Sequence, residues 1–97
     1  MLKKKFLKTK CKVEFSVPAE DDVQSVILIG DFNEWNDTPM EKKGNAFKTT
    51  LDLNLNERYE FRYLVNGAEW LNDGSADDLV PNAFGTENAV VSTQQPQ

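Results

Sequence analysis

The 97-residue sequence predicts an all-β fold, a sandwich of two sheets with about six or seven strands. Apolar and polar side chains alternate along most of the chain, which is the period of strands that bury one face. Strand-like segments recur roughly every 8–12 residues with turn residues between them, as in a sandwich. No stretch has the period of a helix of about 10–12 residues, and the length suits one domain with one core.

Three segments alternate in this way, and a fourth is uniformly apolar. Residues 11–17 and 47–53 each place apolar side chains on one face, and 58–65 is the clearest case because aromatic residues mark that face. Residues 25–30 form a short apolar run between turn signals, which is typical of a central strand. The side chains expected between the sheets are Val13, Phe15, Ile27, Ile29, Leu51, Phe61, Tyr63 and Val65.

A hairpin and a last strand complete the predicted domain. The dipeptide Asn66-Gly67 favours a type I′ turn, because both residues tolerate positive φ, and 69–71 is the expected return strand. Residues 89–91 form the expected closing strand. We therefore divide the chain into a basic arm, a β-sandwich domain and a polar tail, at residues 1–9, 10–92 and 93–97.

Charge is unevenly distributed along the chain. Six lysines give +6 to the first twelve residues, whereas the remaining 85 residues hold five basic and sixteen acidic side chains, a net −11. A body this acidic repels phosphate backbones, so we expect no nucleic-acid partner. We interpret the lysines as a solvated arm or as protection of a sheet edge, with a weak polyanion contact as the alternative. They are Lys3, Lys4, Lys5, Lys8, Lys10 and Lys12.

Composition excludes several classes of protein. With no His and one Cys, His-based triads, zinc sites and disulfide scaffolds are absent, so we expect no metal and no cofactor. No apolar run of about 18 residues is present, so we expect no membrane partner. The basic start lacks the apolar stretch of a signal peptide, and a single Cys11 suits a reducing compartment. The expected location is the cytoplasm, with Cys11 acting as a small apolar strand residue.

Carboxylates offer the remaining route to catalysis. Asp73, Asp77 and Asp78 are close in sequence, but a small sandwich has little room for the cleft that a glycosidase needs. The segment 72–78 also supplies oxygen ligands, yet it lacks the spacing and closing Glu of an EF-hand. We interpret it as a solvated turn with an Asx bond to its own backbone. We predict that the chain is not an enzyme.

Two tryptophans make binding the better hypothesis. Phe32 directly follows a strand and is expected to fold back on the core, whereas the spacing leaves open whether Trp35 is exposed. Trp70 follows the Asn-Gly turn and poses the same question. Two bare indoles would suggest a ligand, and a pyranose presents an apolar C–H face to an aromatic ring. By parity Arg62 lies on the outward face, where it either donates to hydroxyls or is merely solvated or paired across strands.

Four segments in order resemble the family 48 carbohydrate-binding modules. They are Gly30-Asp31-Phe32-Asn33-Glu34-Trp35-Asn36, then 59–67, then Trp70, then 81–88. The family includes the glycogen-binding domain of AMP-activated protein kinase β subunits and the isoamylase N-terminal (early set) domain. The resemblance covers about Val13 to Val91. It implies an immunoglobulin-like sandwich of six to eight mostly antiparallel strands.

The resemblance also implies a function. Members bind α-1,4-linked glucans such as glycogen, starch or maltooligosaccharides. Carried over by position, Trp35 and Trp70 would be stacking platforms, and Phe84 would enter the curve of the glucan. Three polar residues would contact sugar hydroxyls: Arg62, Thr86 and Asn88.

The sequence departs from the family pattern in two places. Ala68 and Glu69 separate Gly67 from Trp70 where the kinase subunits usually have one residue, which could shift the platform. Arg62 replaces a Lys and so changes donor geometry. The alternative hypothesis is a structural or protein-interaction module that has lost the sugar site and associates with an α-glucan-metabolising enzyme. The catalytic barrel of branching and debranching enzymes is not part of this sequence.

Overall fold

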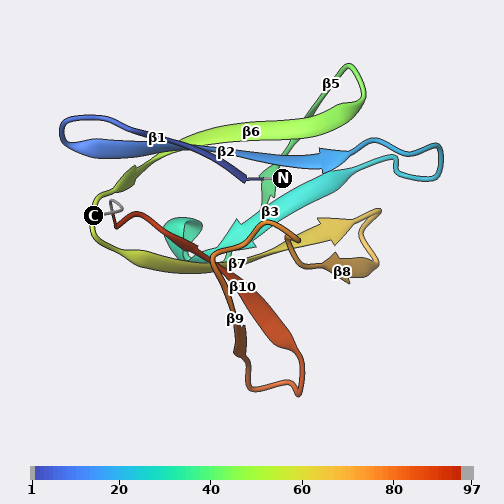
Figure 1. The fold of residues 1–97 in the computed structure, drawn as a ribbon. Coiled ribbons are helices and arrows are strands. Elements are labelled where there is room, and N and C mark those ends of the chain that lie inside the picture. The colour runs from blue at the N-terminus through green and yellow to red at the C-terminus, as the bar shows by residue number, and fades with distance from the viewer. Residues whose placement is uncertain (1, 95–97) are drawn as a thin grey trace.

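The computed structural model describes residues 2–94 and consists of two packed antiparallel sheets (Figure 1). The four-stranded sheet has the order β1-β2-β6-β5, and the six-stranded sheet has β4-β3-β7-β10-β9 with β8 paired to β7. The predicted all-β sandwich is confirmed, with more strands than expected because several short edge strands are present. The elements are β1 (Leu2–Phe6), β2 (Lys10–Pro18), β3 (Val26–Gly30), η1 (Asp31–Asn33), β4 (Thr38–Pro39), β5 (Glu41–Lys43), β6 (Ala46–Asn54), β7 (Arg58–Val65), β8 (Glu69–Leu71), β9 (Asp78–Pro81) and β10 (Glu87–Ser92).

The first strand corrects the expectation of a solvated arm at residues 1–9. β1 pairs with β2 along its whole length. Leu2, Lys4 and Phe6 are partly buried, whereas Lys3 and Lys5 are exposed, so the segment has the period of a strand. Three consecutive lysines conceal this period in the sequence, because they occupy both faces of the strand and a long Lys stem can lie on apolar surface.

The core lies between the sheets and centres on three aromatic side chains. Phe61 and Tyr63 project from β7, and both are fully buried together with Phe15 of β2. Phe61 meets Phe15 and Tyr63 edge-on, with ring centroids 5.2 Å and 5.6 Å apart. Such pairs contribute about 0.5–1.5 kcal/mol each beyond their buried area. Cys11 is buried on the same side of β2 as Phe15, as predicted, and burial raises the pKa of its thiol.

The prediction for β3 chose the wrong face of the strand for the space between the sheets, although Ile29 is buried. Val26 and Leu28 belong to the core cluster, whereas Ile27 and Ile29 lie opposite Leu64 and Arg62 of β7, on the outer face. An uninterrupted apolar run carries no period, so its inward face cannot be read from sequence. Of the other residues predicted for the core, Leu51 is only partly buried.

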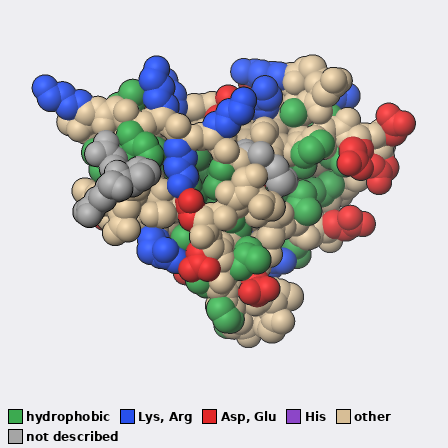
Figure 2. Space-filling model, viewed as in Figure 1, with side chains coloured by type: hydrophobic (Ala, Val, Ile, Leu, Met, Phe, Trp, Pro, Cys, Tyr) green, Lys and Arg blue, Asp and Glu red, His purple; other side chains and the backbone are tan. Residues whose placement is uncertain are grey.

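The outer faces of the two sheets differ in charge. All nine lysines lie in β1, β2, β5, β6 or the β1–β2 turn. The basic residues of the six-stranded sheet are the two arginines, Arg58 and Arg62. In Figure 2 blue side chains line the side of the four-stranded sheet, and red ones gather at the end where the β2–β3 loop lies.

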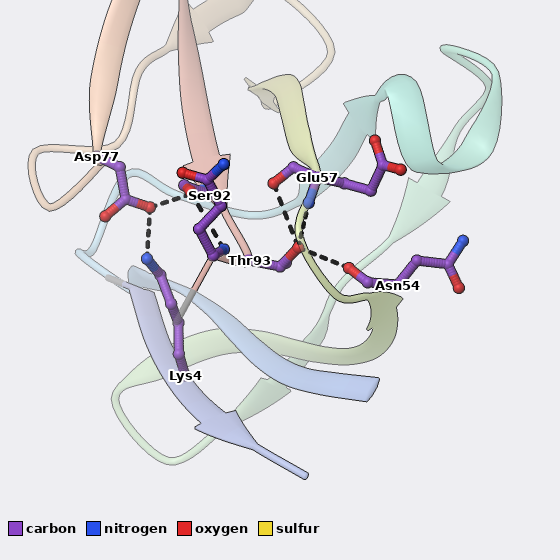
Figure 3. Close-up of polar contacts among 7 residues, drawn as sticks. Lys4, Asn54, Glu57, Asp77, Ser92 and Thr93 are labelled. Carbon is purple, nitrogen blue, oxygen red and sulfur yellow. Dashed lines mark hydrogen bonds and ion pairs between the residues drawn. The ribbon is translucent and has the colours of Figure 1, made fainter. Parts of the chain in front are cut away.

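The residue that follows β10, Thr93, is packed rather than frayed (Figure 3). Thr93, assigned to the tail 93–97, is fully buried. Its hydroxyl accepts from the backbone N–H of Glu57 at 2.9 Å and lies 2.6 Å from the carbonyl oxygen of Asn54. Nearby, the Asp77 carboxylate bonds Lys4 of β1 and the Ser92 N–H of β10, which joins the two sheets. Residues 95–97 of the predicted tail lie outside the described residues.

Within residues 2–94 we find no helix with the length and apolar character needed to cross a membrane.

Candidate functional site

All six side chains singled out from the sequence line one hollow in the six-stranded sheet. Its volume is about 750 Å³. Both indoles are exposed, Trp35 to 40% and Trp70 to 48%, so neither ring is tucked into the core. Asp31, Glu60 and Asn82, to which we gave no role from the sequence, also line it. The six predicted residues are Trp35, Arg62, Trp70, Phe84, Thr86 and Asn88.

Trp35 is held by the carboxylate of Asp31. The indole Nε1–H donates to Asp31 Oδ1 at 2.8 Å, and the other oxygen, Oδ2, accepts from the Glu60 N–H at 2.8 Å. Asp31 thereby connects the Trp35 ring to β7. The indole N–H is thus already used within the protein, and the exposed part of the ring lines the hollow.

The segment before Trp35 supports this arrangement residue by residue. A Cβ on Gly30 would approach the Glu60 carbonyl oxygen and the Phe61 Cβ to 2.7 Å, so β3 can lie this close to β7 only with glycine there. Phe32 packs against the core, as predicted. The Asn33 side chain accepts from the Gly30 N–H at 3.0 Å and donates to the hydroxyl of the β4 residue Thr38.

Trp70 is placed by the β7–β8 hairpin. Asn66 and Gly67 have φ of 54° and 69°, as a type I′ turn requires. The extra residue, Ala68, is absorbed next to the turn, where its N–H donates to the Val65 carbonyl. Trp70 consequently pairs with Leu64 and lies on the outer face of the sheet.

Arg62 reaches from β7 across the Trp70 ring. Its Cζ atom lies 4.8 Å from the ring centroid, which is a cation–π contact. Its Nη1 lies 3.4 Å from the Thr86 hydroxyl. Among residues 2–94 it forms no ion pair, and its buried Nε has no hydrogen-bond partner.

The loop between β9 and β10 is organised by Asn82. Its side-chain oxygen accepts from the N–H groups of Phe84 and Thr86 at 2.9 Å and 3.2 Å. Its amide nitrogen donates to the Asn88 side-chain oxygen at 3.0 Å. These bonds shape a loop that carries Phe84, whose side chain is 89% exposed.

Asn88 forms part of the floor of the hollow. It is only 8% exposed, and its amide nitrogen donates to Glu60 Oε1 at 3.2 Å. Because Asn82 already bonds its oxygen, Asn88 is engaged with the protein at both ends of its amide group.

The carboxylates considered for catalysis have separate structural partners. Asp73 accepts from the Tyr63 hydroxyl at 2.6 Å and from the Ser75 N–H, which is the expected Asx bond. Asp73 itself is buried, whereas Gly74, Ser75, Asp77 and Asp78 of the same turn are exposed. Burial and this hydrogen bond raise the pKa of Tyr63. Asp77 bonds Lys4, and a hydrogen bond from Arg58 lowers the pKa of Asp78. The part of the chain from residue 2 to 94 contains no group of potential ligands able to hold a metal ion.

Comparison with known proteins adds a family and several relatives. A family profile described as the glycogen recognition site of AMP-activated protein kinase matches residues 13–97. The 5′-AMP-activated protein kinase subunit beta-1 of Sus scrofa is 32% identical over 72 residues, which cover 74% of this chain and 57% of that one. The subunits beta-1 of Rattus norvegicus and Homo sapiens are each 31% identical over 72 residues, covering 74% of this chain and 26% of theirs. The chain thus spans only part of these relatives.

Proposed function

We propose that this chain, which belongs to the family of the glycogen recognition site of AMP-activated protein kinase, binds α-1,4-linked glucans without catalysing a reaction. Such glucans include glycogen, starch and maltooligosaccharides. The relatives are subunits of a larger assembly, and the chain covers 57% or less of those named above. We therefore propose glucan binding for this module alone, and not for the whole length of such a subunit.

One observation carries the proposal: two exposed indoles line the same hollow, with polar side chains beside them. A pyranose ring stacks its C–H face on an indole, and its hydroxyls need donors and acceptors at the rim. We assign stacking to Trp35 and Trp70, insertion into the glucan curve to Phe84, and hydroxyl contacts to Arg62, Thr86 and Asn88. Two platforms correspond to an affinity of roughly −5 to −7 kcal/mol, between millimolar and micromolar.

We place the module in the cytoplasm, since a buried free Cys11 suits a reducing compartment. An α-glucan-metabolising enzyme is the partner that we propose for it. The module would then hold the glucan while the enzyme acts on it. If no glucan is bound, the same fold serves instead as a structural or protein-interaction module.

Retention on amylose or glycogen resin tests the proposal. Wild type is compared with Trp35→Ala and Trp70→Ala, and each substitution should cost on the order of 2 kcal/mol, about thirtyfold in affinity. The matched control is Leu7→Ala, which removes an exposed apolar side chain from the β1–β2 turn and should leave retention unchanged. The proposal is wrong if millimolar cyclic α-glucan shifts neither indole N–H signal in an NMR titration.

A further inference from the structure

We propose that Glu60 is a further specificity-determining residue of the hollow: its carboxylate accepts hydrogen bonds from glucan hydroxyls beside the donors of Arg62. This inference rests on the proposed function and names a contact that the sequence pattern did not assign. It makes the site selective for neutral glucans that can donate from their hydroxyl groups.

Glu60 is positioned by groups on both sides. It lies on the outer face of β7, two residues before Arg62, and it lines the hollow. Its backbone N–H donates to the Asp31 carboxylate, which also accepts from the Trp35 indole. Its Oε1 accepts from Asn88, whereas Oε2 has no partner among residues 2–94. A strong acceptor is therefore fixed in place with one oxygen unused.

Arg62 does not neutralise this carboxylate. Neighbours of opposite charge on one strand face could pair, yet no nitrogen of Arg62 comes within 4.0 Å of a carboxylate oxygen in the described part of the chain. The guanidinium lies over Trp70 instead, with a 3.4 Å contact to Thr86. The hollow thus holds a donor group and an acceptor group that remain separate.

Vicinal hydroxyls of glucose match this arrangement. Each hydroxyl has one proton to donate and lone pairs to accept with, so one can donate to Glu60 while its neighbour accepts from Arg62. Hydrogen bonds to a charged partner are shorter and roughly twice as strong as neutral ones. Because the other groups of the floor are already bonded to one another, Glu60 is the strongest acceptor left for a ligand.

The same charges disfavour an anionic ligand. Asp31 and Glu60 contribute −2 and Arg62 contributes +1, so the charged residues that line the hollow sum to −1. A phosphate or carboxylate substituent on the glucan would meet this net negative charge at short range. We therefore assign the hollow to unmodified, neutral α-glucan.

Calorimetric titration of Glu60→Gln tests the inference with two probes, a cyclic α-glucan and its partially O-methylated form. We expect Glu60→Gln to bind the unmodified ring about tenfold more weakly, as loss of a charge-assisted hydrogen bond requires. Methylation removes the hydroxyl protons, so it should weaken binding to wild type much more than binding to Glu60→Gln. Wild type should bind a phosphorylated maltooligosaccharide more weakly than the unmodified one, and this difference in affinity should be smaller for Glu60→Gln.

Glu57→Gln is the matched control, because this exposed residue does not line the hollow. A merely structural role for Glu60 in holding Asn88 predicts the same methylation penalty in wild type and variant, and that result overturns the inference. So does unchanged affinity in Glu60→Gln. Both results leave tryptophan-dependent binding intact, whereas failure of wild type to bind any glucan overturns the proposed function itself. Thermal unfolding of each variant distinguishes lost contacts from lost folding.

Discussion

The two ends of the hollow hold their indoles by different means. At one end Trp35 follows η1 in a loop, and its ring is bonded through Asp31 to the central strand β7. At the other end Trp70 lies on β8, a strand of three residues that pairs with β7, and the Arg62 guanidinium lies over its ring. One platform depends on a hydrogen bond to the ring edge, the other on strand register and a stacked cation. Different substitutions should therefore disable each end.

The largest expected effect comes from changing the register at the Trp70 end. Inserting one glycine between Glu69 and Trp70 moves the indole to the opposite face of the sheet, because strand side chains alternate. Glucan affinity should fall as much as in Trp70→Ala, about 2 kcal/mol. Calorimetric titration with a cyclic α-glucan measures the loss. Wild-type affinity in this variant would show that β8 does not set the direction of the ring.

An intermediate effect is expected from Asp31→Asn at the Trp35 end. The amide nitrogen cannot accept, so one of the two bonds made by Asp31 is lost, at a cost of about 1 kcal/mol, or fivefold in affinity. The Trp35 indole N–H signal should shift in NMR spectra while that of Trp70 stays in place. Asp37→Asn is the control outside the hollow. Equal movement of both indole signals would contradict the separation of the two ends.

The smallest effect is expected from deleting Ala68. The residue lies outside the paired strands, and a two-residue type I′ turn would still place Trp70 opposite Leu64. Affinity should change by less than about twofold. The same titration measures it. A loss as large as that of the glycine insertion would mean that the longer turn, and not the register, orients Trp70.

Sequence patterns predicted those parts of the fold where alternation is regular. β2, β6 and β7 follow from their period of two, and the outward direction of Arg62 follows from the parity of β7. β1 was missed because lysines occupy both of its faces. β9 was missed because Asp78-Leu79-Val80-Pro81 has no alternation.

The residues of the candidate site likewise fall into two groups, those that the sequence pattern identified and those that it did not. Large aromatic residues in polar segments drew attention to Trp35 and Trp70 without any tertiary information. Asp31 and Asn82 act through hydrogen bonds that exist only after distant segments meet, so local pattern does not identify them. Glu60 could have been found, because it shares the outward face of Arg62.

The confinement of every lysine to one side has a practical consequence. Amine-reactive reagents and aldehyde surfaces that react with lysine will attach this molecule through the four-stranded sheet and its β1–β2 turn, because no lysine lines the hollow. Immobilised in this orientation, the module presents both indoles to the solution, which suits it to use as a capture reagent on beads or sensor chips.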